Sequence, residues 1–205
     1  MGEAAKNLGE NGQEPGRAGC AVWFTGLPGS GKSAIAQAVR DALAAAGLPS
    51  VLLSMDERRG RYSAHPGYTG EEREAAYRAF ADEAAGLTRT GNIVLMDATA
   101  YKLAMRRYAR EKIERFAEVY VRCPLAAAMR REAARPDGLV MAGLYAKAVR
   151  RKTTGAPVPG LGEVVGVDVP FEENPAAECR VDSERLSISE ARDLVLARFA
   201  NWFGK

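Results

Sequence analysis

Short apolar runs alternate with amphipathic segments along most of this chain. Each run is bounded by glycine, proline or polar residues, which is typical of buried strands rather than of helices. We therefore predict five strands, over Ala21 to Thr25, Val51 to Ser54, Asn92 to Met96, Phe116 to Arg122 and Glu178 to Val181.

Segments with apolar residues at helical spacing follow these runs. Thr69, with Glu71 and Glu72 close behind it, marks a helix start, because acidic residues there face the positive end of the helix dipole. The stretches 56–70 and 153–169 are predicted to be loops, because the first has few apolar residues and the second has several glycines and prolines. The predicted helices cover Lys32 to Ala46, Thr69 to Thr90, Lys102 to Glu114, Leu125 to Ala134, Leu139 to Lys152 and Ser187 to Phe203.

This alternation of strands and helices predicts an α/β fold with a central parallel sheet. Helices would cover both faces, joined to the strands by right-handed crossovers, which gives three layers. The 205 residues suit one domain, predicted over 19–205. Residues 1–18 are rich in Gly, Glu, Asn and Gln and lack an apolar run, so we expect a disordered segment rather than a signal peptide.

Composition excludes several classes of function. The net charge of +3 is small and the arginines are scattered, so no nucleic-acid partner is expected. No apolar run is long enough for a membrane span. Cys20, Cys123 and Cys179 lie far apart and there is one histidine, which argues against zinc and disulfides and favours the reducing cytoplasm.

The sequence GLPGSGKS, Gly26 to Ser33, carries the most specific chemical signal. Its glycines allow the backbone to wrap a phosphate with N–H groups pointing inward, and a predicted helix follows directly. Lys32 would lie near the β and γ phosphates of ATP and Ser33 would offer a hydroxyl to Mg²⁺. The alternative, a glycine turn that precedes a helix by chance, does not explain the flanking strand and helix. The predicted ATP-binding residues are Gly26, Leu27, Pro28, Gly29, Ser30, Gly31, Lys32, Ser33 and Ala34.

Two aspartates end neighbouring predicted strands. Asp56 and Asp97 would meet the phosphate loop and Cys123 in one crevice, because ligands of parallel sheets bind beyond the carboxyl ends of the strands. A kinase needs a carboxylate near its acceptor hydroxyl, either to take the proton or to order the metal. We predict Mg²⁺ contacts from Ser33, Asp56 and Asp97; for either aspartate the alternative is a helix cap.

Several cations and one aromatic residue follow Asp56. Guanidinium groups pair with phosphate or sulfate, so an anionic acceptor could use them, although a solvated surface run is an equal alternative. Tyr68 could stack on a base or simply pack its loop. A second cationic group, around a break at 136–138, suggests a mobile lid over about 136–168, although ordinary surface charge on helices explains most of these residues equally well. The two groups are Arg58, Arg59, Arg61 and Arg73, and Arg130, Arg131, Arg150, Arg151 and Lys152.

These segments together resemble the adenylylsulfate kinase family of P-loop kinases. The resemblance rests on WFTGLPGSGKS at 23–33, LSMDERR at 53–59, PGYTGEER at 66–73, EVYVRCPL at 118–125, GLYAKA at 143–148 and GVDVPFEENP at 166–175. It implies a cytoplasmic, ATP- and Mg²⁺-dependent kinase that phosphorylates the 3′-hydroxyl of adenosine 5′-phosphosulfate in sulfate assimilation, and it is compatible with a homodimer. The implied roles are Asp56 and Lys32 in catalysis, Arg131 beside the ATP base, and Arg59, Tyr68, Arg73, Thr99 and Lys147 at the substrate.

The chain departs from this family on the acceptor side. Ala76 stands where the family has Asn, Val164 stands where it has an aromatic residue, and MDATAYK at 96–102 brings in Asp97 and Lys102. The alternative activity is therefore a related kinase acting on another small anionic or nucleotide-linked hydroxyl. A nucleotide-dependent regulator is a third hypothesis, which Asp56 among several arginines disfavours.

Overall fold

The computed structural model describes residues 19–62, 69–134 and 143–204. Its centre is a parallel sheet of five strands, as the apolar runs predict, and the strand order is β2-β3-β1-β4-β5. The strands are β1 (Cys20–Thr25), β2 (Ser50–Ser54), β3 (Ile93–Asp97), β4 (Phe116–Arg122) and β5 (Cys179–Asp182).

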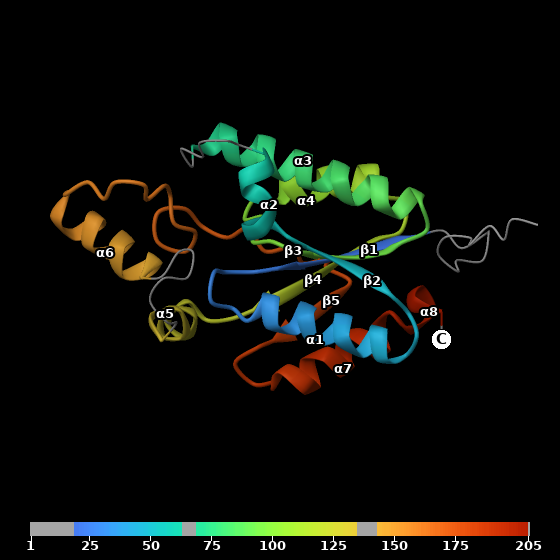
Figure 1. The fold of residues 1–205 in the computed structure, drawn as a ribbon. Coiled ribbons are helices and arrows are strands. Elements are labelled where there is room, and N and C mark those ends of the chain that lie inside the picture. Colours follow the sequence, from blue (N-terminus) through green and yellow to red (C-terminus); the bar gives the residue numbers. More distant parts are fainter. Residues whose placement is uncertain (1–18, 63–68, 135–142, 205) are drawn as a thin grey trace, which may run out of the picture.

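Helices cover both faces of this sheet, so the predicted three-layer α/β fold is confirmed. Figure 1 shows α3 and α4 over one face, α1 and α7 over the other, and α5 and α6 beyond the strand ends from which α1 starts. The helices are α1 (Lys32–Ala45), α2 (Met55–Tyr62), α3 (Gly70–Arg89), α4 (Leu103–Lys112), α5 (Leu125–Ala133), α6 (Leu144–Thr154), α7 (Ile188–Arg198) and α8 (Ala200–Phe203).

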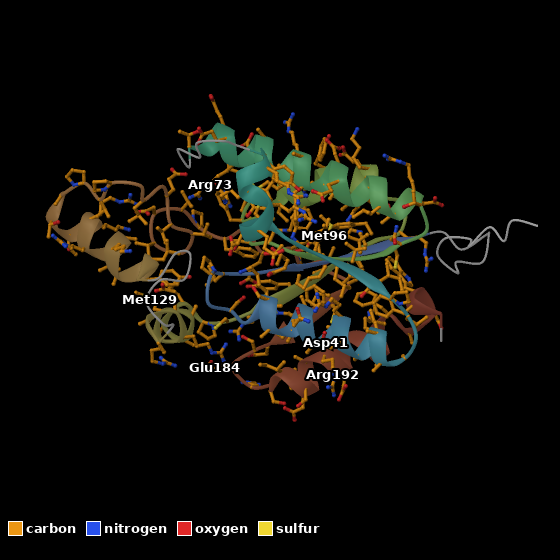
Figure 2. All side chains as sticks on the ribbon, viewed as in Figure 1. Asp41, Arg73, Met96, Met129, Glu184 and Arg192 are labelled. Atoms are coloured by element: carbon orange, nitrogen blue, oxygen red, sulfur yellow. The ribbon has the colours of Figure 1, made fainter. Side chains whose placement is uncertain are left out.

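Alternate residues of β1 and β3 enter two separate apolar clusters. On β1, Trp23 packs with α3 and α4, whereas Val22 and Phe24 pack with α1 and α7. Met96 on β3 lies between the sheet and the α3–α4 layer (Figure 2). All six residues of β1 are buried, which suits the central strand of a sheet covered on both faces.

The predicted start of α3 at Thr69 is confirmed by its hydrogen bonds. The Thr69 side chain accepts from the Glu72 N–H, and the Glu72 carboxylate accepts from the Thr69 N–H, which is a capping box. Helix α7 begins with the same arrangement at Ser187 and Glu190.

Two predictions of local structure are wrong. Residues 55–62 form α2 rather than a loop, because Met55 is buried and Arg58 and Tyr62 both bond to the Glu83 carboxylate on α3. Tertiary contacts therefore stabilise a helix whose own sequence is mostly polar. The predicted closing helix is divided at Phe199 into α7 and α8.

Some predictions fall outside the described residues. These are the disorder of residues 1–18, the role of Tyr68, and residues 136–142 of the predicted lid. In the described part of the chain, no helix combines the length and the apolar character that a membrane span needs. Cys20, Cys123 and Cys179 are buried and form no disulfide among the described residues, and such thiols pack as small hydrophobic residues.

Candidate active site

The phosphate loop connects β1 to α1 in backbone conformations that favour glycine. Gly26, Gly29 and Gly31 all have positive φ, at 148°, 79° and 93°. A Cβ at Gly29 would lie 2.5 Å from the backbone oxygen of Ala128, whereas a Cβ at Gly31 would meet nothing within 4 Å. The loop therefore packs tightly against α5 on one side and is open at Gly31, at the N-terminus of α1.

One cavity of about 320 Å³ adjoins this loop and collects most of the predicted site. Lys32 and Ser33 line it from the start of α1, together with the loop residues Pro28 and Gly29. From the acceptor side come Asp56 and Arg59 on α2, Arg73 on α3, and Asp97 and Thr99 at the end of β3.

The two aspartates reach the cavity because their strands pair in register. Asp97 of β3 lies opposite Phe24 of β1 and Ser54 of β2, so β2 delivers Asp56 to the same sheet edge two residues later. Asp97 is buried, whereas Asp56 is exposed in the first turn of α2. The position of Asp56 also suits the helix dipole, so a capping role and a catalytic role are compatible.

Arg73 is the most buried cation of this site. It projects from the end of α3 that lies nearest to the loop after α6 (Figure 2). Its guanidinium donates to the Glu163 backbone oxygen and lies 5.9 Å from the centre of the Tyr101 ring. By contrast, Arg58 pairs with Glu83 at 2.9 Å and does not line the cavity, so it helps to hold α2 rather than the acceptor.

Cys123, Arg131 and Lys147 are not among the residues that line the cavity. Cys123 packs in an apolar cluster with α5 and α6, because its side chain is buried behind the loop. Arg131 donates to the backbone oxygens of Ser30, at 3.4 Å, and Ser183, at 2.6 Å, so it braces the loop from outside the cavity. Lys147 is exposed on α6 and does not line the cavity. The predicted ligand contacts of Arg131 and Lys147 stay predictions.

The cations of the predicted lid mainly bind its own backbone. Arg151 donates to the backbone oxygens of Leu161, at 2.6 Å, and Gly162, at 3.0 Å, and pairs with Asp168 at 2.6 Å. Lys152 donates to the Val167 oxygen at 3.0 Å. These two side chains fold the segment after α6 onto that helix instead of facing the transferred phosphoryl group.

Sequence reasoning missed four polar residues of the cavity: Tyr77, Tyr101, Glu132 and Glu163. Tyr77 lies four residues after Arg73, so helical spacing could have identified it. Burial raises the pKa of Tyr77, which keeps its hydroxyl protonated. The Glu132 carboxylate accepts from the Leu144 N–H at 2.8 Å and joins α5 to α6, which no sequence signal indicates.

The oxygen donors of the cavity fit Mg²⁺. Ser33, Asp56 and Asp97 supply a hydroxyl and two carboxylates, the kind of donor that this ion prefers. Within the described ranges no group of three or more His, Cys, Asp and Glu side chains could form a metal cage. That suits an ion bound by one or two carboxylates together with substrate phosphates.

The chain is similar to known proteins over most of its length. The family model for adenylylsulphate kinase matches residues 18–182. An adenylyl-sulfate kinase of Synechococcus sp. (strain JA-3-3Ab) is 36% identical over 183 residues, 88% of this chain and 94% of that protein. A probable adenylyl-sulfate kinase of Archaeoglobus fulgidus is 34% identical over 164 residues, 80% of this chain and 96% of that protein.

Solved structures agree with this match. The Mycobacterium tuberculosis APS kinase in complex with AMPPNP and APS aligns with a TM-score of 0.76 and 27% identity, over 90% of this chain and 99% of that chain. A gluconokinase from Sinorhizobium meliloti aligns with a TM-score of 0.57 at 19% identity, which shows the fold alone. With a family model that covers most of its length and relatives above 30% identity, this chain belongs to the adenylylsulphate kinase family.

Proposed function

We propose that this protein transfers the γ-phosphoryl group of ATP to the 3′-hydroxyl of adenosine 5′-phosphosulfate, giving 3′-phosphoadenosine 5′-phosphosulfate for sulfate assimilation. The observation that carries the proposal is one cavity shared by two kinds of groups. The phosphate loop offers Lys32 and Ser33 to a donor nucleotide. Asp56, Arg59 and Arg73 line the same cavity, whose volume is about 320 Å³. Family membership supports the same activity.

The donor side follows from the loop and the helix behind it. Backbone N–H groups at the N-terminus of α1 bind phosphate oxygens, and the Lys32 ammonium neutralises charge on the β and γ phosphates. Mg²⁺, when bound, supplies further neutralisation of the transferring phosphates. Ser33 and the two strand-end aspartates would hold it.

The acceptor side supplies a base and an anion clamp. The acceptor oxygen bonds to the γ-phosphorus as the bond from that phosphorus to the β–γ bridging oxygen breaks, and ADP leaves. Asp56 takes the proton of the hydroxyl, a role that suits its exposed carboxylate at the rim of the cavity. Arg59 and Arg73 pair with the phosphosulfate, because guanidinium groups match its oxygens in fork geometry.

A second acceptor class is favoured by two residues that line the cavity. Val164 offers no ring for stacking on adenine, and Asp97 adds a negative charge. These residues favour another small anionic or nucleotide-linked hydroxyl as the acceptor. Buried thiols and the use of ATP support placing the enzyme in the reducing cytoplasm under either activity.

A coupled ADP-release assay tests the proposal. We expect ADP release with ATP and adenosine 5′-phosphosulfate, none without an acceptor, and none with the 3′-deoxy analogue, which lacks the attacked hydroxyl. A panel of other anionic nucleotides and sugar phosphates runs in parallel. Turnover of a panel member without turnover of the phosphosulfate would replace the proposed activity with the second one. ADP release that is independent of any acceptor would contradict both.

A further inference from the structure

Ala100 has an unusual backbone conformation beside the cavity. Among the described residues it is the one non-glycine residue with positive φ, at 40°. Its neighbours Thr99 and Tyr101 both line the cavity. An L side chain in this region brings Cβ close to the following carbonyl oxygen, so surrounding groups must hold the conformation.

Two buried side chains hold the peptide groups of Ala100. The Ala100 N–H donates to the Tyr77 hydroxyl oxygen at 2.9 Å, and the Arg106 guanidinium donates to the Ala100 carbonyl oxygen. Arg106 comes from α4 and is 2% exposed. Hydrogen bonds therefore hold both the N–H and the carbonyl oxygen of Ala100, between Thr99 and Tyr101.

The same guanidinium binds a second segment, which follows residues that line the cavity. Arg106 also donates to the Glu172 carbonyl oxygen and lies 5.0 Å from the centre of the Phe171 ring. This segment, 171–174, follows the residues 163–165 that line the cavity. The Glu172 N–H donates to the Tyr101 carbonyl oxygen at 2.8 Å, so the two segments form one unit with Arg106 beneath it.

A buried carboxylate pairs with the Arg106 guanidinium. The Arg106 Nε lies 3.1 Å from the Glu118 Oε1 on β4, and both side chains are almost fully buried. The other oxygen of Glu118 accepts from the Asn174 amide at 2.7 Å. A buried charge needs such a partner, and the pair fixes where the guanidinium fork points.

We propose that Arg106 is a positioning residue for the acceptor wall, defined as residues 99–101. Its guanidinium keeps Ala100 at positive φ, and this sets the positions of Thr99 and Tyr101 against the acceptor. Arg106 itself is not one of the residues that line the cavity, so it acts through Ala100. The inference rests on the proposed kinase activity and adds a residue that determines how the acceptor is held.

The substitution Arg106→Lys tests the shape of the side chain separately from its positive charge. Arg106→Lys keeps a cation beside Glu118, but one ammonium cannot reproduce a planar fork that reaches two carbonyl oxygens and a carboxylate. The matched control is Arg110→Lys. Arg110 lies on the same helix, pairs with Glu178 at 2.7 Å and lies 5.0 Å from the Phe116 ring centre, but the contacts found for it do not include the acceptor wall.

Steady-state kinetics with ATP and adenosine 5′-phosphosulfate test the inference. For Arg106→Lys we expect kcat/KM for the acceptor to fall by about 10²-fold, the effect of misplacing a reacting group by about 1 Å. The KM for ATP should stay unchanged, because Arg106 bonds to Ala100 and Glu172 and pairs with Glu118, and none of these three residues belongs to the phosphate loop. Arg110→Lys should leave both parameters unchanged. The inference would be overturned if kcat/KM for the acceptor fell equally in the two variants. It would also be overturned if the fall in Arg106→Lys came only from a smaller fraction of folded, active enzyme.

A rescue experiment examines the role of Ala100 directly. Glycine adopts positive φ without steric cost, so adding Ala100→Gly to Arg106→Lys should recover about tenfold of the lost kcat/KM. If Arg106→Lys does not fold, Tyr77→Phe carries the same test, because it removes the hydroxyl that holds the Ala100 N–H. Absence of rescue by Ala100→Gly in the variant tested would contradict the inference. If the unmodified enzyme does not phosphorylate the acceptor, the proposed activity fails instead.

Discussion

At the scale of single residues, the proposed activity depends on a few side chains that line the cavity. Lys32 and Ser33 are local to one loop, and their neighbours on that loop are glycines with positive φ. Asp56 and Asp97 meet because β2 and β3 pair in register. Single substitutions at Asp56 and at Gly29 of the phosphate loop test this account.

Asp56→Asn should lower kcat by about 10²- to 10⁴-fold, the usual contribution of a general base. The affinity for ATP should change little, because the amide keeps the shape of the side chain and the phosphate loop is untouched. ADP-release kinetics and a nucleotide-binding titration measure the two effects. Asp41→Asn is the control, since Asp41 is exposed on α1 (Figure 2). Loss of ATP binding in Asp56→Asn would leave Asp56 with a metal-binding or structural role only and would contradict its role as the base.

Gly29→Ala should weaken ATP binding by about tenfold or more, because the clash of its Cβ with the Ala128 oxygen must displace the loop. Gly47→Ala separates this effect from backbone strain. Gly47 also has positive φ, at 73°, but a Cβ there meets nothing within 4 Å. We expect that variant to lose about 1 kcal/mol of stability with its ATP affinity intact. Equal ATP affinities in the two variants would contradict the role given to the close contact.

At the scale of elements, short-range signals identify the helices and strands well. The β1 run, the start of α3 at Thr69 and the start of α1 after Gly31 are all confirmed. One exception is α2, which is held by contacts with Glu83, more than twenty residues further along the chain. A local pattern cannot report such contacts.

Thr69→Ala should cost about 1 kcal/mol of stability, because it removes the side-chain half of a capping box. Ser187→Ala, at the same position of α7, should cost about as much. Only Thr69→Ala should raise the KM for the acceptor, since Arg73 lies in the early part of α3 and lines the cavity. Thermal unfolding and kinetics of both variants measure these effects. An equal rise of KM in both would disprove the link between the cap and the site.

At the scale of the whole molecule, partly exposed ion pairs join elements that the sheet alone does not connect. Glu178, before β5, accepts from Arg110 on α4 at 2.7 and 2.9 Å and from the Glu118 N–H on β4 at 2.8 Å. Burial by itself would raise the pKa of Glu178, but the hydrogen bonds from Arg110 and the Glu118 N–H lower it below the ordinary value of 4.5.

The stability of the protein should therefore depend on pH through Glu178. A pKa that is lower in the folded state means that this carboxylate stabilises the protein above pH about 4.5, and that the contribution is lost as pH falls through the folded pKa. Urea unfolding should show Glu178→Gln less stable than the unmodified protein near neutral pH, with a difference that shrinks in acid. Glu184→Gln is the control, because its exposed ion pair with Arg130 is long, at 3.9 Å. A difference for Glu178→Gln that does not vary with pH would rule the linkage out.

The sequence by itself determined the parts of this protein that depend on neighbouring residues. The glycine loop with Lys32 and Ser33, the alternation of strands and helices and the resulting parallel sheet follow from local pattern, because turns, caps and periodicity are short-range properties. The tertiary structure decided which side chains meet. It brought Tyr77, Glu132 and Glu163 to the cavity, turned Arg131 to the outside of the loop, and placed Arg106 beneath Ala100. These outcomes depend on packing between residues far apart in the chain, where no local signal exists.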